Sequence, residues 1–154
     1  MVRFAKPEDA EQINALRRQV NELHVIGRPH HFKSGFNQEL QDHVFLYLTG
    51  GIGYAAVDEE EGQIRGMVLV DYIDRPESPY RYAERFAHIA EICVDEKHRR
   101  QGIASAMIDF ILDYAKEKGY SRLELNMWEF NQDALAFYEA AGFTTFRRYM
   151  EIKL

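Results

Sequence analysis

The stretch IAEICVDEKHRRQGIASA, residues Ile89 to Ala106, decides the fold. It starts with an apolar, strand-like run, Ile89–Val94, which carries one carboxylate at Glu91. A polar and basic segment, Asp95–Gln101, follows, and Gly102 then opens an amphipathic helix. A strand, a basic turn and a helix that begins with small residues form an arrangement in which backbone N–H groups can hold a phosphate. The stretch therefore predicts an anion site, with a lone carboxylate on the strand that leads into it.

Size and composition indicate one folded domain spanning residues 1–154. A chain of 154 residues can bury a sizeable core, and its 46% hydrophobic and 13% aromatic content is typical of a globular protein. No apolar run approaches the ~20 residues that a membrane span needs, and acidic residues arrive too early for a signal peptide. One cysteine, Cys93, excludes an internal disulfide and suits a reducing compartment. We expect a cytoplasmic protein with no membrane partner.

The net charge and the spacing of the histidines limit the kinds of ligand and partner that we expect. The net charge of −6 argues against a nucleic-acid partner and favours a cationic substrate. Three histidines, His24, His30 and His31, match no metal-ligand spacing, and no second cysteine accompanies them. We therefore expect no metal.

The hydrophobic periodicity, together with the glycine and proline residues that end helices and strands, predicts an α/β (α+β) chain with a mixed sheet. Strands are expected at 2–6, 52–58, 64–73, 86–94, 123–128 and 146–154, and the second and third form a hairpin. Helices are expected from Pro7 to Gly27 and at 36–48, 102–118 and 131–141. Asn131 is the expected N-cap of the last helix.

Two segments resemble the motifs of the GNAT superfamily of acyl-CoA N-acyltransferases. Arg99-x-x-Gly102-x-Ala104 after an apolar strand is similar to the signature Q/R-x-x-G-x-G/A. The segment from Asn131 to Phe143 resembles N-x-x-A-x-x-x-Y-x-x-x-G-F. The resemblance implies a mostly antiparallel sheet, splayed at its centre, with helices on both faces. It also implies a transferase that uses acetyl-CoA as co-substrate, and it allows a homodimer.

The resemblance places acetyl-CoA where strand 86–94 separates from strand 123–128. The pantetheine arm would pair with backbone groups of Ile92–Val94, and the diphosphate would bind the amides of Gln101–Ala104. The implied contacts with acetyl-CoA are Ile92, Cys93, Val94, Arg99, Arg100, Gln101, Gly102, Ile103, Ala104, Ser105, Asn131, Ala134 and Tyr138.

Two residues are expected to be catalytic, Glu91 and Tyr138. In a regular strand, Glu91 shares one face with Ile89 and Cys93, and partial desolvation would raise its pKa toward neutrality, as a base for the amine requires. A half-exposed glutamate is the alternative reading, with His88 or a water chain as substitute base. Tyr138 lies at a spacing that also suits a core aromatic, but the family places a tyrosine here to protonate the departing thiolate.

The loop between the first two helices is expected to choose the acceptor. Candidate acceptor contacts are His24, Arg28, Phe32, Phe36, Glu91 and Trp128. We expect a small cationic amine of the polyamine or aminoglycoside kind, attacked directly in a ternary complex and not through Cys93. A protein lysine or N-terminus is the alternative acceptor. A non-catalytic acyl-CoA sensor is the alternative from another class, although the presence of both catalytic candidates argues against it.

Overall fold

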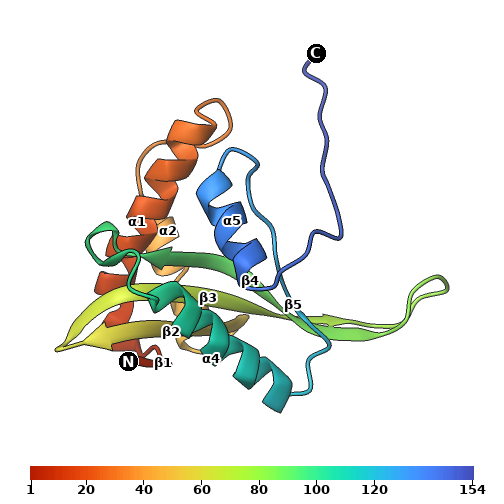
Figure 1. The fold of residues 1–154 in the computed structure, drawn as a ribbon, viewed down its shortest axis with the longest axis horizontal. Helices are drawn as coiled ribbons and strands as arrows, with labels where there is room; N and C mark the ends of the chain where they lie inside the picture. The colour runs from red at the N-terminus through yellow and green to blue at the C-terminus, as the bar shows by residue number, and fades with distance from the viewer.

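The structure, a computed structural model, describes residues 1–154 and contains one five-stranded sheet in the order β1-β2-β3-β4-β5 (Figure 1). Neighbours are antiparallel except β4 and β5, which are parallel. The expectation of a mixed, mostly antiparallel sheet is confirmed. The strands are β1 (Val2–Phe4), β2 (Gly53–Glu60), β3 (Gln63–Arg75), β4 (Glu84–Val94) and β5 (Leu123–Leu125).

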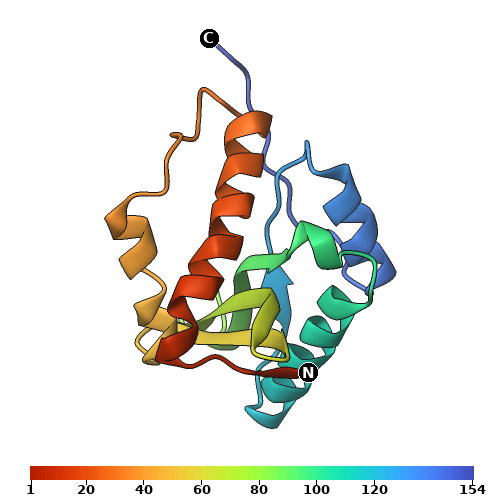
Figure 2. The ribbon, with the colours of Figure 1, turned by 90° about the vertical axis from the view of Figure 1, so that its left-hand side faces the viewer.

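Helices cover both faces of the sheet, as expected, and Figure 2 shows α1 and α2 on one side and α4 and α5 on the other. None of them is both long enough and apolar enough to cross a bilayer. The helices are α1 (Ala10–Gly27), α2 (Gln38–Asp42), α3 (Phe45–Leu48), α4 (Ile103–Glu117) and α5 (Gln132–Ala140), with 3₁₀ turns at Pro7–Asp9 and Glu96–His98.

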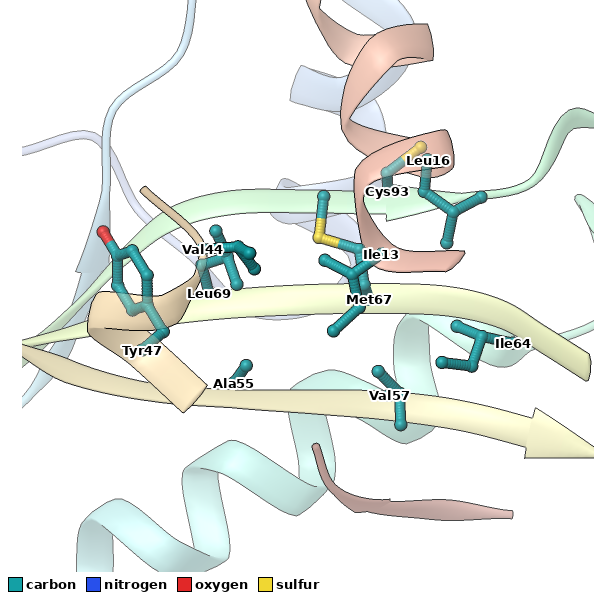
Figure 3. Close-up of a cluster of buried hydrophobic side chains, with 10 residues drawn as sticks. All are labelled: Ile13, Leu16, Val44, Tyr47, Ala55, Val57, Ile64, Met67, Leu69 and Cys93. Atoms are coloured by element: carbon teal, nitrogen blue, oxygen red, sulfur yellow. The ribbon is translucent and has the colours of Figure 1, made fainter. Parts of the chain in front are cut away.

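Two hydrophobic clusters form the core, one on each face. The first lies between the sheet and helices α1 and α3, and Figure 3 shows its members converging on Met67 and Leu69 of β3. The second lies beneath α4 and includes Met107 and Ile111 of that helix together with Val68 of β3. Because successive residues of a strand point to opposite faces, β3 contributes to both clusters and is buried along its centre.

The segment predicted as one helix over 36–48 is two short helices. Asn37 caps α2, because its side chain accepts a hydrogen bond from the Leu40 N–H at 2.9 Å. The apolar residues of this segment recur every four positions and would drift around a helix of 3.6 residues per turn. The break between α2 and α3 lets Val44 and Tyr47 both reach the core, where they are 0% and 5% exposed.

The strand predicted at 146–154 is absent, so that prediction is wrong. Residues 144–154, which we call the C-terminal arm, contain no regular structure, and all are exposed. The arm runs clear of the sheet and extends beyond the rest of the molecule in Figures 1 and 2. Alternating polarity favours a strand only where an edge is within reach, and the arm pairs with no strand of its own chain.

Candidate active site

A bulge in β4 organises the site. Leu69 of β3 pairs with Glu91 and Val70 pairs with Ile89, so Ala90 is the extra residue without a partner. The extra residue inverts the alternation of side chains, so Ile89 packs beneath α4 whereas Cys93 packs beneath α1. The prediction that Ile89, Glu91 and Cys93 share one face is therefore wrong, because it assumed a regular strand.

Beyond the bulge, β4 has a free backbone edge on the side of β5. The two strands pair only from Ala87 opposite Leu123 to Ile89 opposite Leu125. Ile92–Val94, the segment predicted to bind the pantetheine arm, therefore pairs with β3 alone. An extended ligand can form strand-like hydrogen bonds with such an edge.

The start of α4 has free N–H groups that face open space. Gly102, the N-cap, has φ +78°, and no side chain caps the helix. A Cβ atom at Gly102 would meet nothing within 4 Å. Arg100 is also left-handed, with φ 62°, and the neighbouring Arg99 and Gln101 are exposed like Arg100 itself. Free amides at the positive end of a helix dipole, with two arginines beside them, fit a diphosphate.

Glu91 is held by a buried arginine, Arg17, which is not among the predicted site residues. Arg17 donates from Nε and Nη2 to the two carboxylate oxygens of Glu91, each at 2.9 Å. Its side chain is 3% exposed, and Nη1 donates to Asn14 Oδ1 at 3.0 Å and to the Leu40 carbonyl at 2.6 Å. Glu91 thus has a charged partner in place of the apolar surroundings expected. Arg17 follows Ile13 by four residues on the buried stripe of α1, and that spacing was the available signal.

Tyr138 lies on α5 with its ring packed among aromatic neighbours. The ring centroids of Phe137 and Phe143 are 5.3 and 5.6 Å away. Burial raises the pKa of the Tyr138 hydroxyl to about 12, so the phenol keeps its proton at neutral pH. Asn131 caps α5, as predicted, by accepting a hydrogen bond from the Ala134 N–H at 3.3 Å.

Cys93 is poorly suited to covalent catalysis. Burial raises the pKa of its thiol to about 11, which leaves the sulfur protonated at neutral pH. The nucleophilic form of cysteine is the thiolate, so this environment disfavours an acetyl-cysteine intermediate.

Four of the residues predicted to contact the acceptor substrate lie together, whereas a fifth, Phe36, lies apart from them. His24 stacks on Phe32 with ring centroids 5.1 Å apart, and Phe32 meets Trp128 edge-on at 5.2 Å. The Arg28 guanidinium lies 5.0 Å from the Trp128 ring centroid. Burial lowers the pKa of His24, which favours its neutral form, while the nearby Glu91 carboxylate opposes the shift. Phe36 instead packs against Arg17, at 5.3 Å from the guanidinium to the ring centroid.

A row of polar side chains crosses the sheet on the α1 face. Asp71 of β3 is directly opposite His88 of β4, which is opposite Glu124 of β5. The Tyr47 hydroxyl donates to Asp71 at 2.7 Å, and His88 Nδ1 lies 3.6 Å from Glu124 Oε1. No local sequence pattern indicates this row, because it depends on the register between three strands. No group of three or more His, Cys, Asp or Glu side chains is arranged to hold a metal ion.

Comparisons with known proteins agree on one family. The model of the acetyltransferase (GNAT) family matches residues 17–143. The chain is 34% identical over 105 residues to N-acetyltransferase 8 of Homo sapiens, in an alignment that covers 68% of this chain and 44% of the relative. The chain therefore spans less than half the length of that relative.

Two solved structures show the same fold over the whole chain. A mutant of the BH1408 protein from Bacillus halodurans is 27% identical, with a TM-score of 0.95 over 100% of this chain and 99% of the other. AAC(6')-Iy in complex with a bisubstrate analogue of CoA is 15% identical, with a TM-score of 0.76 over 100% of this chain and 97% of the other. The second similarity concerns the fold alone.

Proposed function

Because the chain belongs to the acetyltransferase (GNAT) family, we propose that it transfers the acetyl group of acetyl-CoA directly to a primary amine. One observation carries the proposal: the free edge of β4 leads into the uncapped, left-handed start of α4. A long ligand with a diphosphate would use both features, the edge for its amide-containing arm and the helix start for its charge.

Bound acetyl-CoA supplies an activated thioester. In this proposal, backbone groups of Ile92–Val94 pair with the pantetheine arm, and the amides of Gln101–Ala104 hold the diphosphate together with Arg99 and Arg100. Asn131 adds a contact through the side-chain amide that its capping bond leaves free.

Proton movements are assigned to Glu91 and Tyr138. Glu91 takes the proton of the incoming ammonium, directly or through a water, on a lone pair that its two hydrogen bonds from Arg17 leave free. A backbone N–H of Ile92–Val94 stabilises the negative charge that develops on the thioester carbonyl oxygen. Tyr138 gives its proton to the departing thiolate, and its protonated state at neutral pH supports this role.

The proposed acceptor is a small cationic amine. Asp71 pairs with the neutral Tyr47 hydroxyl, so its negative charge is available to an ammonium. The aromatic faces around Phe32 and Trp128 add a surface that cations favour. His24 of the aromatic group and Tyr47, which binds Asp71, both lie close enough to Glu91 to feel its charge, and this proximity supports an acceptor with several amines. The cytoplasmic location stays a prediction.

Release of free CoA thiol from acetyl-CoA tests the proposal. A polyamine, an aminoglycoside and a lysine-containing peptide are offered separately, and a small amine should give the highest kcat/KM. Preference for the peptide would favour the protein acceptor. Binding of acetyl-CoA without thiol release from any amine would favour the non-catalytic sensor.

The thermal shift with acetyl-CoA tests the location of the anion site. Acetyl-CoA should raise the Tm of the wild type, because a ligand that binds only the folded state stabilises it. Gly102→Glu should abolish this shift by placing a carboxylate where the diphosphate binds. Gly119→Glu is the matched control, since Gly119 follows α4 with φ +70° and also faces open space. Equal shifts in both variants would place the ligand elsewhere.

A further inference from the structure

From the cluster of groups around Glu91, we infer that His24 carries the proton of the acceptor amine from Glu91 to solvent. The inference rests on the proposed function and adds a second proton-transfer group to the same site. In this step the carboxylic acid form of Glu91 loses the proton and the neutral imidazole of His24 gains it. The imidazolium then gives the proton to bulk water, so both groups return to their starting states.

The pairing of Glu91 with Arg17 creates the need for such a step. Arg17 is 3% exposed and donates to both oxygens of Glu91, each at 2.9 Å. A proton on Glu91 would leave the guanidinium buried beside a neutral acid, and a buried charge without a counter-charge is costly. A neutral base near Glu91 would restore the ion pair by removing the proton.

His24 lies on the same side of α1 as Arg17. The two residues are seven positions apart, which is two turns and about 10 Å along a helix. The Glu91 carboxylate is close enough to raise the pKa of His24, in opposition to burial. A water or the acceptor nitrogen between the two side chains can therefore pass the proton from one to the other.

Aromatic neighbours keep the resting imidazole neutral. The His24 ring stacks on Phe32 at 5.1 Å and meets Phe130 edge-on at 6.3 Å. Phe130 in turn lies against the end of α1, since a Cβ atom on Gly27 would be 2.3 Å from its ring. These neighbours carry no charge, and burial among them lowers the pKa of His24 from its usual 6.5. The ring is thus ready to accept a proton at neutral pH.

The remaining surroundings of His24 suit release of the proton. The side chain is half-buried, so part of the ring reaches solvent. Of the nearby cations, Arg17 is engaged by Glu91, and Arg28 donates to Glu151 at 2.9 Å. Glu91 is therefore the charge that acts on His24, and its carboxylate attracts the proton-carrying form of the ring while the transfer takes place.

Thiol release by His24→Gln tests the transfer. With an amine whose chemical step limits turnover, kcat should fall about 10-fold or more, and imidazole added to the assay should restore part of the loss. His24→Phe keeps a ring without nitrogen and should lose activity in the same way. His30→Gln is the matched control, because His30 is exposed in the same loop and should keep the wild-type kcat without a response to imidazole.

Wild-type kcat in either His24 variant would overturn the inference and leave the proposed function intact. A loss of kcat that imidazole does not relieve would also overturn it, because His24 would then have a packing role. Absence of thiol release by the wild type with every amine would overturn both.

Titration of His24 by NMR gives a second readout that needs no turnover. Glu91→Gln should lower the pKa of His24 below its wild-type value, because the neutral amide no longer favours the imidazolium. The same pKa in both proteins would show that the two groups do not act on each other, and the proposed transfer would be wrong.

Discussion

At the scale of single residues, Arg17 determines the position and the charge pairing of Glu91. It is buried, holds both oxygens of Glu91 and links them to Asn14 and to the carbonyl of Leu40. Glu91 could be predicted from the sequence as a lone carboxylate on an apolar strand, but its partner could not, because Arg17 and Glu91 are 74 positions apart. A buried charge requires a counter-charge, and only the fold shows which residue supplies it.

Two variants, Arg17→Lys and Arg17→Met, test whether Arg17 positions Glu91 for catalysis or only stabilises the fold. The lysine keeps the charge but cannot hold both oxygens, so we expect kcat to fall by roughly 10-fold with an unchanged KM for acetyl-CoA. The methionine leaves Glu91 without a counter-charge, and we expect a larger fall. Steady-state kinetics with circular dichroism melting curves check both variants. Equal activity of both variants at equal Tm would contradict a positioning role.

Tyr138→Phe removes the proposed proton donor and keeps the ring. We expect kcat to fall roughly 100-fold, as is typical for the loss of a general acid, with little change in acetyl-CoA affinity. The measurement is thiol release with a substrate whose chemical step limits turnover. Tyr80→Phe is the control, because Tyr80 is 81% exposed in the β3–β4 connection. If Tyr138→Phe turns over at the wild-type rate, Tyr138 has a packing role and is not the proton donor.

At the scale of elements, local sequence predicts where helices begin better than how strands pair. Gly102 and Asn131 correctly predicted where α4 and α5 begin, because a helix cap depends on residues that are neighbours in the sequence. The bulge at Ala90 and the row from Asp71 to Glu124 left no such signal, because strand register is set by partners far away in the sequence. The arm shows the same limit, since a strand pattern does not name its neighbour.

The junction between β1 and α1 should respond to acid. Arg3 donates to Asp9 at 2.7 and 3.0 Å, and this pairing holds the pKa of the Asp9 carboxyl below its usual 3.8. A folded-state pKa below the unfolded value gives stability that is present above pH ~4 and is lost as the pH falls through the lowered value. Asp9→Asn should therefore lower the Tm at pH 7, with a difference that disappears in strong acid.

Asp113→Asn is the control for this pH series. Asp113 pairs only with the exposed Lys116 at 3.3 Å, so its substitution should leave the Tm nearly unchanged at every pH. A deficit of Asp9→Asn that persists unchanged below pH 2 would show that its packing, and not its charge, stabilises the junction.

The loop after α1 should control acceptor affinity without affecting acetyl-CoA. Phe32→Ala removes the ring that bridges His24 and Trp128, so the acceptor KM should rise severalfold while the KM for acetyl-CoA is unchanged. Phe36→Ala is the informative comparison, because Phe36 packs on Arg17 and should lower kcat as well. Initial rates with each substrate varied in turn separate these effects. Equal changes in both KM values would remove Phe32 from the acceptor site.

At the scale of the whole molecule, β3 joins the two faces into one unit, because it contributes side chains to both hydrophobic clusters. Met67 and Val68 are neighbours in the chain but belong to different clusters, and both are 0% exposed. The overall class of fold could be predicted because hydrophobic periodicity and the order of elements constrain it strongly. The bounds of β5 could not, since only three of its residues pair with β4.

The parallel pairing of β4 and β5 also predicts an order of events in folding. The antiparallel hairpins of β2, β3 and β4 close over short connections, whereas β5 must wait until α4 has crossed over the sheet. We therefore expect the two sides of the proposed acetyl-CoA site to meet after the transition state. Acetyl-CoA should slow unfolding and leave the refolding rate unchanged, and stopped-flow fluorescence of Trp128 measures both. In a cell, the lifetime of the folded protein would then depend on the concentration of acetyl-CoA, whereas its rate of folding would not.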